Sequence, residues 1–196
     1  MKETAKKLFT AFVGESQARN RYTIFSKIAK KEGFVLISEI FLETADQEKV
    51  HGSWFYTMLQ GLKKEESFDE MKVLPDADFP TTHGSTVENL KSSIAGENME
   101  WQTLYPDIAE TAEKEGYPDI ANRVHGIMSA EKHHAERYDK LLKLIGDDVF
   151  FKRGKKIVWI CLECGYEVEL DELPENWKCP SCSHSRAYFR KKNEDF

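Results

Sequence analysis

The chain has 196 residues, and its 28 lysines and arginines against 34 aspartates and glutamates give a formal net charge of −6. This acidic balance argues against nucleic acids and anionic membranes as partners. No apolar run approaches the length of a membrane span, and residues 1–4 lack the apolar stretch of a signal peptide. We therefore expect a cytoplasmic protein without a membrane segment.

Four segments before residue 146 place apolar side chains at steps of three and four, which is the spacing of one helix face. The four stripes run from Leu8 to Ala29, from Ile37 to Leu62, from Leu90 to Ile108 and from Ile120 to Ile145. Gly33 and Gly116 fit short turns between helices, and the stretch from Gly61 to about Ser85 fits a long crossover. The pattern predicts an all-α four-helix bundle over residues 1–146.

The four helices form an internal repeat. Ile37 matches Ile120 and Glu48 matches Glu131 at an offset of 83 residues, whereas upstream Glu15 matches Glu97 at an offset of 82. A tyrosine follows Glu15 by seven residues and Glu97 by eight. The first part of each repeat therefore carries one glutamate helix, and the second part carries a Glu-x-x-His helix.

Each apolar stripe is interrupted near its middle by ionisable residues, namely Glu15, then Glu48 and His51, then Glu97, then Glu131 and His134. A buried charge must be paired or must bind a metal, and we find no arginine or lysine on the stripes near these residues. Two metal ions in a four-helix bundle require this set of one Glu from each of two helices and Glu-x-x-His from the others. We therefore predict a dinuclear carboxylate site. Glu100, one turn beyond Glu97, could be a further ligand or an exposed charge.

All four cysteines lie in the last 36 residues, in two Cys-x-x-Cys pairs separated by fourteen residues: Cys161, Cys164, Cys179 and Cys182. Such paired knuckles indicate a metal site, and disulfides are not expected in the cytoplasm. The spacing leaves zinc and iron open, but a one-electron iron carrier beside a two-metal redox site has a clear use. We predict a small four-cysteine domain over residues 157–196, joined to the bundle by a solvated, basic linker over residues 147–156.

The sequence resembles the rubrerythrin family, in which a ferritin-like di-iron domain precedes a rubredoxin domain. The resemblance covers nearly the whole chain and is carried by Gly14-Glu15-Ser16, Glu48-x-x-His51, Gly96-Glu97-x-x-Glu100-Trp101, Tyr105-Pro106, Ala130-Glu131-x-x-His134, Cys164-Gly165-Tyr166 and Cys179-Pro180. It departs from the family in a long gap between the knuckles and in Ser183, which stands where many rubredoxins have glycine. His133 and His184 are interpreted as surface residues, or in the case of His184 as interdomain.

The resemblance implies three iron ions per chain, two in the bundle and one held by the four cysteines. It implies that the iron ligands and catalytic residues of the bundle are Glu15, Glu48, His51, Glu97, Glu100, Glu131 and His134. Glu48 and Glu131 would bridge the two irons, and Glu100 and His51 would exchange places on one iron with its oxidation state. Tyr22 and Tyr105 resemble the tyrosines that lie beside the family's di-iron site.

The resemblance also implies an activity, the reduction of hydrogen peroxide to water in oxidative-stress defence. Electrons would come from reduced pyridine nucleotide through a separate reductase or rubredoxin, and they would enter at the four-cysteine iron. A homodimer, or a higher oligomer, would bring the rubredoxin domain of one subunit to the di-iron site of another. Two alternatives are a ferroxidase that handles iron and a non-enzymatic protein with a zinc ribbon.

Overall fold

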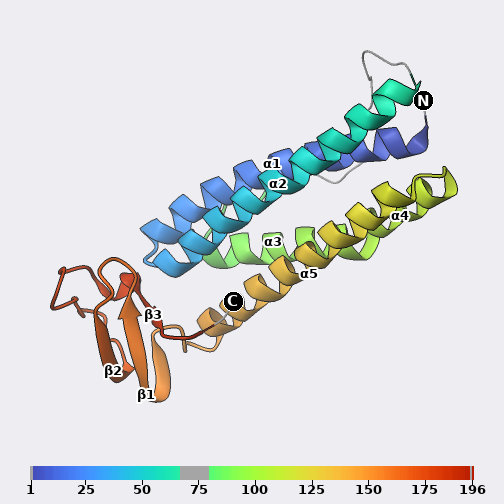
Figure 1. Cartoon of the computed structure of the whole chain (residues 1–196). Helices are drawn as coiled ribbons and strands as arrows, with labels where there is room; N and C mark the ends of the chain where they lie inside the picture. Colours follow the sequence, from blue (N-terminus) through green and yellow to red (C-terminus); the bar gives the residue numbers. More distant parts are fainter. Residues whose placement is uncertain (1, 67–79, 195) are drawn as a thin grey trace.

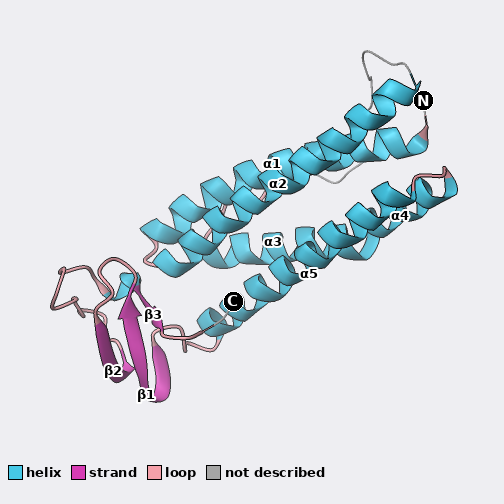
Figure 2. Ribbon diagram, in the orientation of Figure 1, coloured by secondary structure: helices cyan, strands magenta, loops and turns pink. Residues whose placement is uncertain are grey.

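The computed structural model describes residues 2–66, 80–194 and 196 (Figure 1). Its elements are α1 (Glu3–Lys31), α2 (Val35–Glu66), α3 (Thr86–Met99), a π-helical segment (Glu100–Leu104), α4 (Tyr105–Lys114), α5 (Pro118–Gly146), β1 (Lys152–Cys161), β2 (Glu167–Glu172), a 3-10 turn (Arg186–Tyr188) and β3 (Phe189–Lys191). Within the described residues, no helix is long and apolar enough to cross a membrane. The helix predicted from Leu90 to Ile108 is in the structure one continuous rod, which consists of α3, the π-helical segment and α4 (Figure 2).

The bundle consists of two helical hairpins. Helix α1 packs along α2, while α3 and α4 both pack along α5 (Figure 1). The turns of the two hairpins contain Gly33 and Gly116, and both glycines have a φ of +88°. A left-handed residue just beyond a helix end is favoured as glycine because a Cβ would clash there. Equivalent glycines thus end the first helix of each hairpin at equivalent places.

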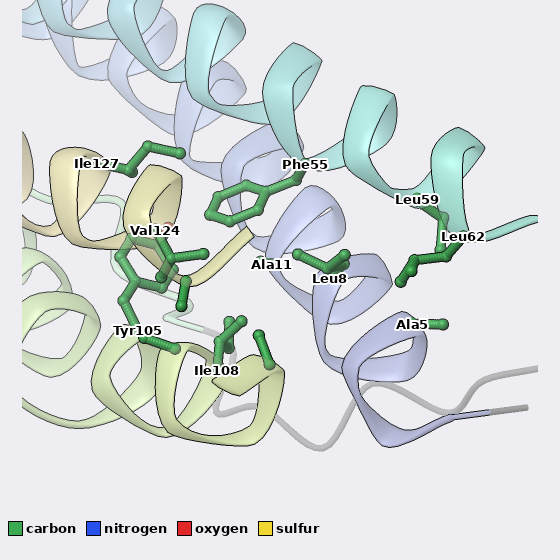
Figure 3. Close-up of a cluster of buried hydrophobic side chains, with 13 residues drawn as sticks. Ala5, Leu8, Ala11, Phe55, Leu59, Leu62, Tyr105, Ile108, Val124 and Ile127 are labelled. Atoms are coloured by element: carbon green, nitrogen blue, oxygen red, sulfur yellow. The ribbon is translucent and has the colours of Figure 1, made fainter. Parts of the chain in front are cut away.

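Two apolar clusters fill the bundle. In one of them, Leu8, Phe55, Ile108 and Val124 come from different helices and meet on the bundle axis (Figure 3). The other cluster contains a group of aromatic rings in which Phe41 contacts Tyr22, Phe25 and Tyr138. On α1, the first cluster ends at Ala11 and the second begins at Ala18, so the ionisable residues of the stripes lie between two apolar layers.

The crossover between the hairpins starts later than the sequence suggests. Helix α2 continues through Gly61 to Glu66, because Leu62 buries its side chain in the first cluster and is followed by residues of high helix propensity. Gly61 therefore lies inside the helix, and Pro75 lies outside the described residues. Ser85 caps α3 with its side chain, so the predicted end of the crossover is confirmed.

The C-terminal domain is a three-stranded antiparallel sheet in the order β2-β1-β3, with Trp159, Leu173 and Phe189 in its core. Strand β1 already begins at Lys152, so the basic residues of the predicted linker belong to the sheet. Arg153 forms a two-pronged ion pair with Glu194, at 2.9 and 2.7 Å. The pairing partner lies 41 residues away, which is why the local sequence reads as a linker.

The short connection between the two domains is also packed rather than solvated. Phe150 is buried, and its ring lies 5.2 Å from that of Phe34 at the start of α2 and 4.9 Å from that of Phe151. The sheet domain consequently sits at the end of the bundle where α2 begins and α5 ends (Figure 1). Aromatic packing of this kind restricts the hinge motion that a solvated linker would allow.

Replacing Phe41 should test the aromatic layer. The Phe41 side chain is fully buried, and removing its ring leaves a cavity among three aromatic neighbours. We expect Phe41→Ala to lower the free energy of unfolding by about 3–5 kcal/mol, measured by urea denaturation of the metal-free protein followed by circular dichroism. Its neighbour Leu42 is 44% exposed, so Leu42→Ala should change stability by only about 0.5 kcal/mol. Equal losses in both variants would contradict this assignment of the core.

Candidate metal centres

Six ionisable side chains meet at the centre of the bundle and form two overlapping groups. One group is Glu15, Glu48, His51 and Glu131, and the other is Glu48, Glu97, Glu131 and His134. In each group, the possible ligand atoms all lie within 4.8 Å of one another. Because Glu48 and Glu131 belong to both groups, their carboxylates can contact two metal ions at once.

The spacing within each helix produces this geometry. Residues three apart on a helix project to the same side, so each Glu-x-x-His pair points inward together. His51 Nδ1 lies 2.7 Å from an oxygen of Glu131 on the opposite hairpin and 3.1 Å from one of Glu48. His134 Nδ1 lies 2.8 Å from Glu131 and 3.3 Å from Glu48. Each histidine therefore reaches both of the shared carboxylates.

The possible ligand atoms of this cluster would be better satisfied by metal ions than they are by hydrogen bonds to one another. Six buried atoms of the cluster lack a well-aligned hydrogen bond within the described residues, although the two imidazoles lie within ion-pair distance of Glu131. They are Glu15 Oε2, Glu48 Oε1, Glu97 Oε2, Glu131 Oε1 and Oε2, and His134 Nδ1. Buried polar atoms are almost always hydrogen-bonded, and leaving this many unpaired would cost several kcal/mol. Carboxylate oxygens and imidazole nitrogens are suitable ligands for divalent iron and related ions. Bound cations would therefore satisfy the unpaired atoms.

The electrostatics of the cluster show the same need for positive charge. Burial raises the pKa of Glu97 to about 8, with a further contribution from the charge of Glu48. Burial also raises the pKa of Glu15 well above its usual value, as do the charges of Glu48 and Glu131. Burial opposes the charge of His51, but its contacts with Glu131 and Glu48 raise its pKa to about 9. Without metal, the cluster holds protons in place of cations.

Glu100 lies beside the cluster rather than in either group of possible ligands. Its carboxyl is buried, and burial together with the charges of Glu97 and Glu131 raises its pKa well above the usual value. Its alternative interpretation as an exposed surface charge is therefore wrong. Burial thus disfavours the charged form of this carboxyl beside the candidate metal ligands.

The π-helical segment explains the irregular offset of the repeat. A π-helix has hydrogen bonds from residue i to i+5, so it accommodates one more residue than an α-helix does over the same turn. The segment Glu100–Leu104 lies between Glu97 and Tyr105, where the offset between the repeats changes from 82 to 83. The extra residue therefore bulges out, and Tyr105 still reaches the core position that corresponds to Tyr22.

The two tyrosines connect the hairpins through the cluster. The Tyr22 hydroxyl of α1 donates to Glu97 on α3, and the Tyr105 hydroxyl of α4 donates to Glu15 on α1. Both tyrosines are fully buried. Each glutamate that belongs to only one group of possible ligands is thus held by the tyrosine of the opposite hairpin.

Sequence reasoning missed a buried arginine near the cluster. Arg137 is only 3% exposed and lies one turn beyond His134, on the same face of α5. It pairs with Glu43 at 3.0 Å rather than with the carboxylates of the cluster. The expectation of no cation on the stripes was therefore wrong, although the cluster still lacks a neutralising partner. Gln47, which accepts a hydrogen bond from His134 Nε2 at 3.0 Å, was missed as well, because glutamine carries no charge to mark it.

The four cysteines meet in the small domain. Within the described residues all four are free, with Sγ atoms 3.7 Å apart for Cys161 and Cys182 and 3.6 Å apart for Cys164 and Cys179. Thiolates about 2.3 Å from one tetrahedral metal ion would be about 3.8 Å apart. The four sulfurs are therefore arranged for a single ion.

The two cysteine knuckles have the same backbone shape despite the Ser183 substitution. Gly165 and Ser183 each follow the second cysteine of a knuckle, and both are left-handed, with φ of +74° and +62°. The backbone N–H of Tyr166 points to Cys164 and lowers the pKa of its thiol to about 6. The N–H of His184 points in the same way to Cys182. Serine therefore keeps the glycine turn at the cost of a strained conformation.

The remaining histidines differ in their surroundings. His133 is exposed, in agreement with its interpretation as a surface residue. His184 is half-buried, and its Nδ1 lies 3.4 Å from Cys182 Sγ. A thiolate can only accept, so His184 would donate this bond when a metal is bound. Its role is thus within the small domain rather than at an open surface.

A four-helix bundle with two linked carboxylate–histidine groups, followed by a four-cysteine domain, defines a ferritin-like dimetal protein with a rubredoxin-type site. A family model described as rubrerythrin matches residues 6–142, and one described as the rubredoxin-like domain of rubrerythrin matches residues 159–190. The chain belongs to the rubrerythrin family. The predicted fold class, the di-iron site and the four-cysteine site are thereby confirmed.

Similar proteins match along nearly the whole chain. A Methanocaldococcus jannaschii protein assigned to the rubrerythrins is 48% identical, covering 100% of this chain and 96% of the relative. Rubrerythrin-1 of Clostridium acetobutylicum is 45% identical, covering 99% of this chain and 96% of the relative. Among solved structures, fully reduced, all-ferrous nigerythrin is similar with a TM-score of 0.63 and 28% identity, covering 98% of this chain and 88% of that one.

The pH dependence of stability should reveal the protons held by the metal-free cluster. In the folded protein the pKa of Glu97 is about 8 and that of His51 is about 9, above their ordinary values of 4.5 and 6.5. Between about pH 5 and pH 9 the folded chain therefore binds more protons than the unfolded chain, and its stability falls as the pH rises. The opposite shift of Glu48, to about 2, acts only below this window. Thermal unfolding of chelator-treated protein should show a lower midpoint at about pH 8.5 than at about pH 6.

The Glu97→Gln variant provides the control, because its neutral amide removes one titrating group while keeping the shape. It should flatten the slope with pH, whereas Glu113→Gln on the exposed surface should not. Divalent iron displaces the protons, so metal-loaded protein should lose the downward slope. A metal-free midpoint that rises steadily from pH 6 to pH 8.5 would contradict the raised pKa values.

Proposed function

We propose that this protein is a peroxidase that reduces hydrogen peroxide to water with electrons that enter through its four-cysteine iron. The single observation that carries the proposal is the presence of two different metal centres in one chain. One is a buried pair of sites that share Glu48 and Glu131, and the other is a thiolate site for one ion. A two-metal centre can deliver two electrons together, while a thiolate-bound iron passes them singly.

When two ferrous ions are bound, they supply the two electrons that break the O–O bond of peroxide. Two protons complete the balance, so that each peroxide yields two water molecules. Glu100 is buried next to the cluster, where its surroundings raise the pKa of its carboxyl, and it is proposed to donate one of these protons. The buried hydroxyls of Tyr22 and Tyr105 hold Glu97 and Glu15 in place while charge changes nearby.

Access to the cluster is proposed to be through a groove that residues of α2 and α5 line. His51 lines this groove together with Val50, Trp54 and Ile127, and its side chain is 12% exposed. A small, uncharged molecule such as peroxide can reach the cluster there. Glu100 and His51 are proposed to exchange on one iron with its oxidation state. The burial of Glu100 beside the cluster and the partial exposure of His51 support this exchange.

Electron delivery is proposed to occur between subunits of a head-to-tail homodimer. The sheet domain sits at one end of its own bundle (Figure 1), whereas His51, which lines the groove, lies near the middle of α2. Val50 and Trp54, which are 53% and 39% exposed, offer an apolar surface for a partner's four-cysteine domain. A separate reductase or rubredoxin would pass electrons from reduced pyridine nucleotide to this iron. We place this activity in the cytoplasm, in oxidative-stress defence.

Single-turnover oxidation distinguishes this activity from ferroxidase chemistry. Anaerobically reduced, iron-loaded protein should be oxidised by one equivalent of peroxide per di-iron site, at least tenfold faster than by dioxygen. Stopped-flow absorbance at the ferric bands measures both rates. Faster oxidation by dioxygen, with iron accumulating beyond three ions per chain, would instead establish an iron-handling protein.

Cys164→Ser tests the electron-input role of the small domain. The substitution removes one of four thiolates, so the visible thiolate-to-iron bands should disappear. The bundle has its own core, so the di-iron site should still load and react once with peroxide. Steady turnover from reduced pyridine nucleotide with a reductase should fall by at least a hundredfold. The surface variant Glu169→Gln on β2 is the control, and unchanged turnover in Cys164→Ser would exclude the relay.

A further inference from the structure

The two histidines of the cluster are equivalent in the repeat but have different outer environments. His134 is 2% exposed, and its Nε2 is hydrogen-bonded to Gln47 Oε1 at 3.0 Å. His51 is more exposed, and no group in the described part of the chain forms a hydrogen bond with its Nε2. One imidazole is therefore held on both sides, while the other is held only on the side of the cluster.

The repeat shows where this difference arises. At the offset of 83, Gln47 on α2 corresponds to Ala130 on α5, and Arg137 corresponds to Trp54. Alanine cannot accept a hydrogen bond from the His51 imidazole, and tryptophan cannot hold such an acceptor in place as an arginine does. The polar network on the His134 side is thus replaced by small and apolar residues on the His51 side.

The network around Gln47 determines which ring nitrogen of His134 carries a proton. Arg137 is only a donor, and its Nη2 lies 3.4 Å from Gln47 Oε1, so this atom must be the amide oxygen. Gln47 Nε2 points to the carboxylate of Glu43, at 3.3 Å, which agrees with the assignment. The oxygen accepts from His134 Nε2, so that nitrogen carries the proton. When a metal ion is bound, Nδ1 then presents its lone pair to that ion.

The arginine is itself fixed in place. Its guanidinium donates to Glu43 at 3.0 Å and to the hydroxyl of Thr44, both on α2. Glu43 is 57% exposed, so the ion pair connects the buried arginine to solvent at one edge. Three residues of α2 therefore clamp one residue of α5 at the height of the cluster. A buried arginine paired in this way stays charged and strongly oriented.

We propose that Gln47 and Arg137 are positioning residues that lock His134 as a permanent ligand, and that their absence on the other side leaves His51 free to move. The inference rests on the proposed function, because it explains which of two equivalent histidines can exchange with Glu100. The two residues act through His134 and do not contact the metals themselves.

Zinc-loaded protein offers a test that is independent of peroxide chemistry. Nitrogen-15 NMR of the imidazoles should show one Nε2–H protected from exchange with solvent in the wild type, that of His134. Gln47→Met, which keeps the size but removes the acceptor, should lose this protection. Zinc affinity should fall by about 10–100-fold, measured by competition with a chelator. Gln47→Glu keeps an acceptor oxygen and should restore both properties.

Two controls separate positioning from folding. Gln60→Met makes the same change elsewhere on α2 and should leave the imidazole signal and zinc affinity unchanged. Thermal unfolding of each metal-free variant checks that the bundle is intact. If Gln47→Met does not fold, Arg137→Met provides the same test, because Arg137 contacts Gln47 rather than His134 itself. A protected His134 signal with affinity within twofold of wild type, in a folded Gln47→Met, would overturn the proposal.

The reverse substitution tests the asymmetry directly. The double variant Ala130→Gln with Trp54→Arg places both residues of the network where the repeat predicts that they meet His51, and it should produce a second protected Nε2–H. If the His51 Nε2–H still exchanges freely with solvent in this variant, the assignment of its mobility to these two positions is overturned. Failure of the peroxidase activity would leave these zinc measurements unaffected, so the two proposals can fail separately.

Discussion

The structure depends on the concentration of like charge at the centre of the bundle. Four carboxylates from four helices approach one another in a buried space, with only two imidazoles between them. Their repulsion and desolvation would oppose folding unless protons or cations compensate. Both histidines contact both shared glutamates, Glu48 and Glu131. The positive charge that the protein itself supplies therefore neutralises the central pair of carboxylates. The two outer glutamates depend on tyrosine hydroxyls and on what is bound.

Apolar layers above and below the cluster make this arrangement tolerable. The first layer, around Phe55, and the second, around Phe41, both contain buried side chains from α1, α2 and α5, so they hold these helices together on either side of the cluster. The packing of the whole bundle then offsets the free-energy cost of the unpaired ligand atoms. A site of this kind is preorganised, because the helices rather than mobile loops set the positions of its ligands.

Much of this could be predicted from the sequence because the relevant signals are periodic. Helix stripes, the internal repeat and the spacing of cysteines all follow from local geometry, so the cluster and the four-sulfur site were found by pattern alone. The predictions are wrong where a residue that is distant in the sequence determines the local structure. Lys152 belongs to a strand because Glu172 pairs with it, and Arg137 is buried because Glu43 and Thr44 lie opposite on another helix. The change of offset from 82 to 83 was visible, but a π-helical turn is too rare to infer from one extra residue.

The repeat also shows how an almost symmetric scaffold can carry an unsymmetric reaction. Duplication of one hairpin gives two equivalent sites, and an equivalent pair has no reason to respond differently to a change in oxidation state. Three departures break the equivalence near the same point. Glu100 stands where the first repeat has Ala18, and the π-helical segment begins at Glu100. Gln47 is hydrogen-bonded to His134, whereas the equivalent position in the second repeat is Ala130. The first two place a further carboxylate beside the cluster, and the third gives the two histidines different outer contacts. Under the proposed function, these departures would confine ligand movement to the side of His51, which lines the groove between α2 and α5.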